Sequence, residues 1–369
     1  MSEWKECKLG DMLVFQRGYD LPKTNMKDGS IPVAASNGII GYHNESTTKG
    51  PGITIGRSGN IGIPKYYRTD FWAHNTVLYV KDFKGNDERF SFYFLHGFDL
   101  EGLNAGSAVP TLNRNHLYEI PVIIPPIPEQ KAIASVLSSL DDKIDLLHRQ
   151  NKTLEAMAET IFRQWFVEGV NWDGALSEYI KVQGGYAFKS ADFKEKGSNG
   201  IIKITNISIG CINIVNTQFV DDSIVKSLDS NKFKIISGDI LIAMTGAEIG
   251  KIGIVEKTKK SLWLNQRVGK LIPNVTYGEY IGYLALKSTE GQDYIINACA
   301  GSAQENISSS KLEEMKFVSY SKEKTESFGI EVKPFFEKII FNQKQIRTLS
   351  TLRDTLLPKL MSGEVRVAV

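Results

Sequence analysis

The chain has 369 residues, of which 42% are hydrophobic and 23% are charged, and its formal net charge is +2 at pH 7. This length suits two ordinary domains, and the composition is typical of a globular protein. No run of about 18 apolar residues suggests a membrane span, and the N-terminus lacks the basic and then apolar layout of a signal peptide. The small net charge says little about nucleic acid, because local clustering of charge matters more than the total.

The sequence contains two copies of one large unit. Gly18-Tyr19 recurs as Gly185-Tyr186, an offset of 167 (185 − 18), and Gly106-Ser107-Ala108 recurs as Gly301-Ser302-Ala303, an offset of 195 (301 − 106). The second copy is therefore 28 residues longer (195 − 167) over this interval. We interpret the duplication as a pseudo-two-fold molecule, whose two similar surfaces suit a ligand with its own approximate dyad, such as duplex DNA.

Two intermediate matches locate the additional residues. Ile53-x-Ile55 matches Ile240-x-Ile242 at an offset of 187 (240 − 53), and Asn75 is matched to Asn265 at an offset of 190 (265 − 75). Most of the insertion therefore lies between the Gly-Tyr and the Ile-x-Ile segments of the second copy. Variable front portions and matched rear portions indicate that the fronts bind different things while the rears share one geometry.

Each front portion is predicted to be mixed α/β and mostly strand. Short apolar runs that follow turn residues predict strands at 51–56, 77–80, 238–243 and 268–272. A glycine-rich loop follows the first strand of each pair. The aromatic segments at 90–95 and 280–284 are expected to be core helices.

Each rear portion is predicted to be a long amphipathic helix. Pro128-Glu129-Gln130 is a favourable helix entrance, and apolar residues then recur at gaps of three and four, as in a coiled-coil seam. In the first helix these positions are Leu137, Leu140, Ile144, Leu147, Leu154, Met157, Ile161 and Trp165. Adding 195 gives Val332, Phe335, Ile339, Asn342, Leu349, Leu352, Leu356 and Leu360. Either each helix only covers its own domain, or the two pack antiparallel on each other; the long shared seam favours the second alternative.

One asparagine interrupts each seam and suggests a register. If Asn151 faces Asn342, the residue numbers of opposed positions add up to 493. Nearly every layer is then apolar, and the two amides satisfy each other and fix the register. The further opposed pairs are Leu147 with Ile346, Leu154 with Ile339, Ile144 with Leu349 and Leu137 with Leu356.

The sequence carries no recognisable catalytic or metal-binding motif. The Asn-Pro-Pro-Tyr of adenine methyltransferases and the phosphate-binding Gly-x-x-x-x-Gly-Lys-Ser/Thr are absent, and Gly56-x-x-Gly59-x-x-Gly62 has the wrong spacing for a dinucleotide site. The five histidines show no ligand pairing, and no Cys-x-x-Cys occurs. The three cysteines are odd in number and far apart, which argues against a disulfide framework and for a reducing cytoplasm. We therefore expect a binding protein without a metal.

The polar loops of both copies are the candidate DNA contacts, because Arg, Lys, Asn, Gln, Ser and Thr side chains read base edges and hold phosphates. In the first copy the candidates are Arg57, Ser58, Asn60, His74, Asn75, Thr111, Asn113, Arg114 and Asn115. In the second copy they are Thr245, Glu248, Lys251, Asn265, Gln266, Arg267, Gln304, Asn306, Ser308 and Lys311. For any single residue the alternative is a solvated or turn-capping side chain. Gly18 and Gly185 are expected to allow tight turns that place Tyr19 and Tyr186, and these tyrosines are either contacts or core residues.

With its parts in this order, the chain resembles the specificity (S) subunits of Type I restriction–modification systems over essentially its whole length. The central region of that family is similar to residues 123–137, Ile-Ile-Pro-Pro-Ile-Pro-Glu-Gln-Lys-Ala-Ile-Ala-Ser-Val-Leu, and to the continuation at 140–144. Further similar segments are the opening Trp4-Lys5-(x)3-Leu9-Gly10-Asp11, Ile31-Pro32-Val33, residues 201–207 and the tail 356–365. One departure is that Pro-Pro-Ile-Pro-Glu-Gln has no clean second copy, so the second helix is expected to begin differently.

The resemblance implies an α+β fold class, with two mixed α/β target recognition domains joined by two long conserved helices packed as an antiparallel coiled coil in a pseudo-two-fold repeat. The implied domains are residues 1–124 and 169–327 for target recognition. Residues 125–168 and 328–369 are the central helix and the C-terminal helix with its tail, which act as spacers and as docking sites.

The resemblance also implies a function. The chain would be a non-catalytic, sequence-specific DNA-binding subunit in the cytoplasm, with no cofactor or membrane contact of its own. Its two domains would each read one half of a bipartite target on double-stranded DNA. Two methyltransferase (M) subunits would bind S-adenosylmethionine and methylate adenine, and restriction (R) subunits would add cleavage of unmodified DNA.

Two other classes of protein stay open at this point. A two-headed scaffold whose polar loops bind protein is slightly favoured by the low net charge, and a steep salt dependence of DNA binding would count against it. An enzyme with an unrecognised site, such as the detached half of a fused restriction–methylation protein, conflicts with the missing methylation motif.

The length of the seam gives a first prediction. From Leu137 to Ile161 it covers 25 residues, or roughly 37 Å at ~1.5 Å per residue, close to one DNA turn of about 34–36 Å. Deleting one heptad should therefore change the spacer of the recognised target and leave the half-sites alone. Mapping of the methylated sites measures both, and an unchanged spacer would refute the idea.

Overall fold

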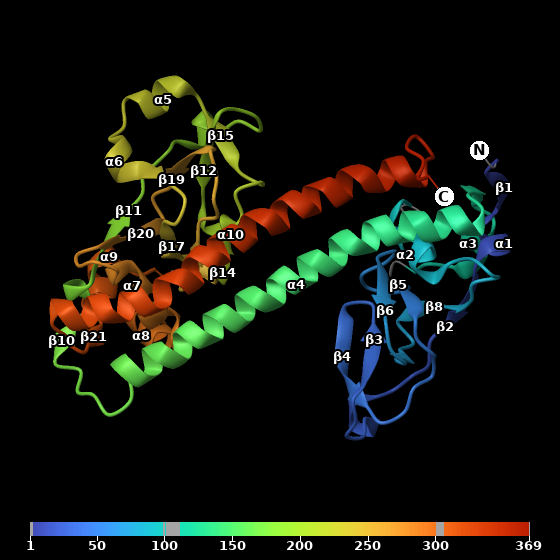
Figure 1. Cartoon of the computed structure of the whole chain (residues 1–369), viewed down its shortest axis with the longest axis horizontal. Helices are drawn as coiled ribbons and strands as arrows, with labels where there is room; N and C mark the ends of the chain where they lie inside the picture. Colours follow the sequence, from blue (N-terminus) through green and yellow to red (C-terminus); the bar gives the residue numbers. More distant parts are fainter. Residues whose placement is uncertain (1–2, 99, 101–110, 300–305, 369) are drawn as a thin grey trace. The chain divides into compact units, whose positions relative to one another are not determined.

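The computed structural model describes residues 3–98, 100, 111–299 and 306–368. The chain forms two compact units, residues 1–143 with 349–369, and residues 144–348. Each unit contains part of α4 (Ile127–Phe166) and part of α10 (Lys322–Met361), the two longest helices in Figure 1. The matched triplets at 106–108 and 301–303 lie outside the described residues.

The first unit is built on a four-stranded antiparallel sheet of order β2-β8-β5-β6. A smaller sheet has the order β4-β3-β7, and β1 pairs with β9. The strands are β1 (Lys5–Lys8), β2 (Val14–Arg17), β3 (Ile31–Ala35), β4 (Gly38–His43), β5 (Gly52–Gly56), β6 (Pro64–Tyr67), β7 (Trp72–Ala73), β8 (Val77–Asp82) and β9 (Pro121–Ile124). The helices are α1 (Leu9–Met12), α2 (Glu88–His96), α3 (Arg114–Tyr118) and the 3-10 turn η1 (Lys23–Asn25).

The second unit contains a six-stranded sheet of order β11-β20-β17-β18-β14-β13, a four-stranded sheet of order β15-β12-β19-β16, and the pair β10-β21. Its strands are β10 (Gly174–Ala175), β11 (Ile180–Gly184), β12 (Asn199–Ile202), β13 (Ile207–Ser208), β14 (Gly210–Ile212), β15 (Gln218–Val220), β16 (Lys234–Ile235), β17 (Ile240–Ala243), β18 (Ile252–Ile254), β19 (Ser261–Leu264), β20 (Val268–Pro273) and β21 (Lys316–Phe317). Its helices are η2 (Leu176–Glu178), η3 (Ser190–Asp192), η4 (Ile204–Asn206), α5 (Asp222–Lys226), α6 (Ser230–Phe233), η5 (Gly246–Glu248), α7 (Gly278–Lys287), α8 (Thr289–Cys299) and α9 (Ser309–Glu313).

The two units share one plan, as the duplication predicts. The order β2-β8-β5-β6 returns as β11-β20-β17-β18, and the parallel pair β3-β7 returns as β12-β19. The expected strands and core helices are confirmed as β5, β8, β17, β20, α2 and α7. The elements β13, β14, α5 and α6 account for the predicted insertion, because they lie between the second Gly-Tyr and β17 in the chain.

One predicted match is wrong by a residue. Val77 N–H donates to the carbonyl of His74 at 3.1 Å, and Val268 N–H donates to the carbonyl of Asn265 at 2.9 Å. The backbone equivalent of Asn265 is therefore His74, at an offset of 191 (265 − 74), rather than Asn75. Identical residue types had suggested the other alignment, whereas backbone hydrogen bonds define equivalence.

The long helices run antiparallel in each unit. In the second unit Asn342 Nδ2 donates to Asn151 Oδ1 at 2.8 Å, and the rings of Trp165 and Phe328 are 5.9 Å apart, so the residue numbers of both pairs add up to 493. This confirms that the two asparagines face each other. In the first unit Leu137 is buried in a cluster against which Leu356 packs.

Two seam positions predicted to be buried are wrong. Met157 and Leu352 are 45% and 44% exposed. Both helices also place residues outside the predicted seam in the core of the second unit, namely Ala158, Phe162 and Phe166 of α4 and Phe328 and Phe336 of α10, together with the predicted seam residue Val332. The predicted α+β class with two long antiparallel helices is confirmed. The two packing alternatives both hold, because each helix packs against the other helix and also covers the cores of the domains.

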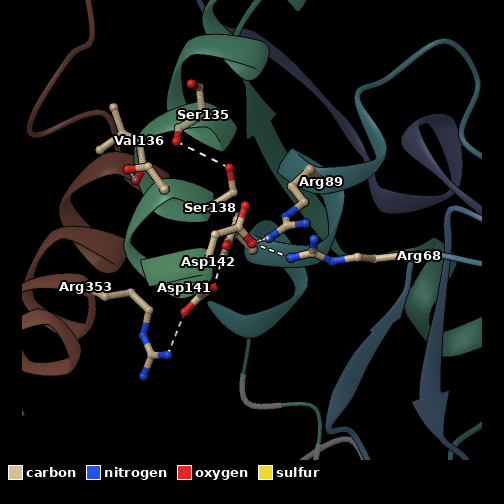
Figure 2. A network of polar contacts seen from close by, with 10 residues as sticks. Arg68, Arg89, Ser135, Val136, Ser138, Asp141, Asp142 and Arg353 are labelled. Atoms are coloured by element: carbon tan, nitrogen blue, oxygen red, sulfur yellow. Dashed lines mark hydrogen bonds and ion pairs between the residues drawn. The ribbon is translucent and has the colours of Figure 1, made fainter. Parts of the chain in front are cut away.

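Polar contacts attach the helices to the first domain. Figure 2 shows Asp142 of α4 between Arg68 and Arg89, and Asp141 beside Arg353 of α10. The distances are 3.2 Å from Arg89 Nη2 to Asp142 and 2.8 Å from Arg353 Nη1 to Asp141. Two cations on one carboxylate, with a third on its neighbour, fix the rotation of α4 about its own axis at this point.

A second polar group, the carboxylate of Glu129, connects three segments of the first unit at the start of α4. Glu129 is 2% exposed and accepts from Trp4 Nε1 at 3.2 Å and from Arg366 Nη2 at 2.6 Å. The hydrogen bond from Arg366 holds the pKa of Glu129 below its usual value. One carboxylate thus joins the N-terminal segment, the helix and the C-terminal tail.

The helices begin by different means, as the missing second Pro-Pro-Ile-Pro predicted. Prolines precede and open α4, whereas the Ser321 hydroxyl accepts from Lys324 N–H at 3.4 Å at the start of α10. Within the described residues, no helix has the length and apolar character needed to cross a membrane.

The asparagine pair yields a prediction. Asn342 is fully buried, and its Oδ1 has no partner among the described residues, so Asn151→Leu would leave its whole amide unpaired. We expect a loss of about 1–3 kcal/mol in the free energy of unfolding, most of it recovered in Asn151→Leu/Asn342→Leu. A double-mutant cycle by urea unfolding measures the coupling. The exposed Leu352→Gln serves as control, and additive effects at the two asparagines would contradict the pairing.

Candidate nucleic-acid interface

Three loops of the first domain meet at one end of its main sheet. Arg57, just after β5, donates its N–H to the carbonyl of Thr76 at 2.8 Å, and its own carbonyl accepts from Leu112 N–H at 2.9 Å. Ser58 forms a β-bridge with Thr111. The loop after β5, the turn before β8 and the segment leading into α3 therefore lie side by side, which brings the first set of predicted residues together.

The second domain repeats this arrangement with other side chains. Met244 N–H donates to the carbonyl of Arg267 at 3.0 Å, Ile307 N–H donates to the carbonyl of Met244 at 3.0 Å, and Thr245 forms a bridge with Asn306. The backbone positions of Arg57 and Thr76 are thus occupied by Met244 and Arg267. We call these two matching regions the three-loop surfaces.

The Gly-Tyr segment joins each three-loop surface. A Cβ on Gly18 would lie 2.1 Å from the carbonyl oxygen of His74, and one on Gly185 would lie 2.2 Å from that of Asn265. Neither glycine has a positive φ. The predicted tight turns are therefore wrong, and the glycines serve close backbone approach instead. Tyr19 and Tyr186, of which 42% and 37% are exposed, are surface residues rather than core residues.

An unpaired positive charge marks the first three-loop surface. Burial and the neighbouring Arg17 lower the pKa of Arg57, and among the described residues neither guanidinium has a carboxylate partner. Arg17 was not predicted from the sequence, although it directly precedes the repeated Gly-Tyr. Two adjacent cations without counter-charges are suited to binding a phosphate group or the edge of a guanine.

The turn before β8 adds the polar side chains of His74 and Asn75 to this surface. His74 Nδ1 is 3.1 Å from Thr76 Oγ1, and burial lowers the pKa of His74, which favours its neutral form at pH 7. Asn75 Nδ2 donates to Asp20 Oδ1 at 2.6 Å. An imidazole and an amide at this position offer both donors and acceptors to a base edge.

The second three-loop surface has more of its charges paired. Glu248 and Lys251 form an ion pair, as do Lys311 and Glu314 at 2.6 Å. Arg267 is exposed and has no carboxylate partner among the described residues. Each surface therefore presents at least one free guanidinium, supplied by a different loop in the two domains.

Two predicted contact residues cap helices. The Asn113 side chain accepts from Asn115 N–H at the start of α3, and the Ser308 hydroxyl accepts from Lys311 N–H at the start of α9. These oxygens satisfy helix N–H groups, which was the alternative weighed for single residues. The predicted residues that are exposed are Asn60, Asn113, Arg114, Asn115, Gln266, Arg267, Asn306, Ser308 and Lys311, whereas Thr245 is buried, so the prediction that its side chain contacts DNA is wrong; Gln304 lies outside the described residues.

The part of the chain that the structure describes contains no group of three or more His, Cys, Asp or Glu side chains placed to hold a metal ion.

A family model described as the Type I restriction modification DNA specificity domain matches residues 1–156 and again residues 170–348. The chain belongs to this family. It is built from two copies of the DNA specificity domain, and each match contains one three-loop surface.

Individual relatives agree with the family. The chain is 25% identical over 289 residues to the Type I restriction enzyme MjaIX specificity subunit of Methanocaldococcus jannaschii, a match covering 73% of this chain and 66% of that protein. It is also 25% identical over 305 residues to the MjaVIII specificity subunit of the same organism, covering 76% and 71%. The crystal structure of the Type-I restriction-modification system S subunit from M. genitalium has a similar fold, with a TM-score of 0.67, 19% identity and coverage of 97% of this chain and 96% of that one.

Adjacent glycines of the second specificity domain allow a matched test of the close approach. The Cβ of Gly185→Ala would meet backbone at 2.2 Å, so the Tyr186 segment must move, whereas at Gly184 the nearest atom is Ser309 Oγ at 3.9 Å. We expect Gly185→Ala to lower the free energy of unfolding by about 1–3 kcal/mol, and Gly184→Ala to change it by less than about 1 kcal/mol. Thermal unfolding of both variants measures this, and equal effects would contradict the close-approach role.

Proposed function

We propose that this chain recognises a bipartite DNA target, one half with each three-loop surface, and thereby directs the modification of that target. The observation that carries the proposal is the duplicated surface itself: the same three loops meet at the same sheet end in both domains, yet present different side chains. One domain offers Arg57 with Thr76, and the other offers Met244 with Arg267. A matched frame with different reading groups suits two half-sites of different sequence.

The contact residues proposed for each half-site are the polar side chains of the three-loop surfaces, together with Arg17 in the first domain. Free guanidinium groups suit both phosphates and the bidentate recognition of guanine. His74, whose pKa burial lowers, and the amides of Asn75 and Asn265 suit mixed donor and acceptor patterns. The capping residues Asn113 and Ser308 would act indirectly, by fixing α3 and α9 beside these loops.

The proposed partners follow from the family. M subunits, two in number, would dock on the long helices of segments 125–168 and 328–369, and would carry the S-adenosylmethionine for adenine methylation; R subunits would add cleavage. Apolar side chains exposed on the helices support docking there: Leu146 and Met157 on α4, and Ile330, Phe341 and Leu352 on α10. Such exposure on a helix outside its own core is typical of an interaction surface. This chain would perform no catalysis itself.

The test is to co-express the chain with its M subunit and to map methylated adenine across the host genome. We expect a bipartite motif with a fixed spacer. The M subunit expressed alone is the control and should leave that motif unmethylated. Arg57→Ala and Arg267→Ala should each relax specificity by about 1–3 kcal/mol at a position in one half-site only.

The contrary outcomes are distinct. Methylation with no sequence preference would contradict target recognition by this chain. A single undivided motif would contradict the division between the two domains. Binding of the purified complex to DNA that does not weaken with salt would favour the alternative of a protein-binding scaffold.

A further inference from the structure

Tyr19 and Tyr186 occupy the same place in the two domains. Tyr19 N–H donates to the carbonyl of Ala73 at 2.8 Å, and Tyr186 N–H donates to that of Leu264 at 2.9 Å; each tyrosine also forms a parallel bridge with the next residue, His74 or Asn265. The residue before each is a glycine that leaves no room for a Cβ. The backbone is thus held so that one large side chain emerges beside each three-loop surface.

The groups that support the two rings differ. The Tyr19 ring lies 6.3 Å from the ring of Tyr79, and its hydroxyl accepts from Gln16 Nε2 at 2.8 Å. The Tyr186 ring lies 5.0 Å from Phe188 and 5.7 Å from Phe233 of the inserted α6. Different surroundings therefore present the same side chain, which argues that the tyrosine itself, rather than a shared packing arrangement, is what the two domains have in common.

Both rings stay on the surface although neighbouring apolar groups offer burial. Exposed fractions of 42% and 37% forgo part of the stabilisation that burying an aromatic side chain provides. The hydroxyl of Tyr186 has no hydrogen-bond partner among the described residues, and that of Tyr19 lies 3.4 Å from the Tyr79 hydroxyl, a long contact in which either oxygen can donate. A phenolic hydroxyl at the rim of a DNA-binding surface is one of the groups that contact phosphate oxygens.

We propose that Tyr19 and Tyr186 contact the sugar–phosphate backbone, one in each half-site, while the divergent positions around them read the bases. This inference rests on the proposed function. Two domains that read different sequences share only what is common to both half-sites, and that is the backbone. Positions that are identical in the two domains therefore fit the backbone, and positions that differ, such as Arg57 against Met244 and Thr76 against Arg267, fit the bases.

The test uses the full chain in complex with its M subunits and three labelled duplexes: the target mapped by methylation, and two copies in which one half-site or the other is scrambled at constant composition. We expect Tyr19→Phe and Tyr186→Phe each to weaken binding about three- to tenfold on all three duplexes, so that the preference for the intact target is unchanged. Tyr42→Phe, at a 56% exposed tyrosine in β4 of the first domain, is the matched control and should bind as the wild type does.

Each of the other possible results contradicts one specific step of the proposal. If a tyrosine variant loses affinity for the intact target but not for a duplex with one scrambled half-site, that tyrosine reads bases. If binding is unchanged on every duplex, it is not a contact. If the wild-type complex itself does not prefer the intact target, the proposed function fails, and the inference falls with it. Unchanged thermal unfolding of the variants separates these outcomes from misfolding.

Discussion

Each recognition domain can bury its core only with apolar side chains supplied by both long helices. In the second unit Phe162 and Phe166 of α4 meet Phe328 of α10 at ring distances of 6.3 and 4.8 Å. In the first unit Leu137 of α4 and Leu360 of α10 are almost fully buried in one cluster. Since burying such a side chain stabilises a fold by about 1.5–3 kcal/mol, a domain without either helix would lose much of its core. Each domain therefore needs both helices, packed side by side, to complete its hydrophobic core.

Comparison of the two units distinguishes the features that the fold requires, which recur, from the side chains proposed to contact the ligand, which mostly differ. The sheet order, the Gly-Tyr approach and the capped helices α3 and α9 recur in both units, although their sequences have diverged. Most side chains on the three-loop surfaces do not recur, Tyr19 and Tyr186 being the exception. Stability thus depends on backbone relations that any suitable residue satisfies, while the proposed recognition would depend on side chains that the fold does not constrain. Such a division lets the loops change without loss of the core.

The helices and the asparagine pair could be predicted because they follow from spacing and repetition, whereas the meeting of the polar loops depends on the order of the strands in the sheet. Gaps of three and four identify a helix face only to within about one residue, which explains why Met157 and Leu352 were wrongly placed in the seam. The capping roles of Asn113 and Ser308 required the start of each short helix to be known. Arg17 was missed because a charged residue at the end of a strand is usually just solvated; its proximity to Arg57 arises only when β2 and β5 flank β8.

The distribution of charge bears on the choice between DNA and protein as the ligand. A net charge of +2 gives no overall attraction to DNA. Many carboxylates, however, are engaged at the long helices: Asp141 and Asp142 with arginines in the first unit, Glu155 and Glu159 with Lys287, and Glu256 with Arg347 in the second. Arg17, Arg57 and Arg267 beside the loops have no such partners among the described residues. The carboxylates at the helices are thus paired, whereas these guanidinium groups beside the loops are available to an anionic ligand. The low net charge of the whole chain therefore does not by itself favour a protein ligand.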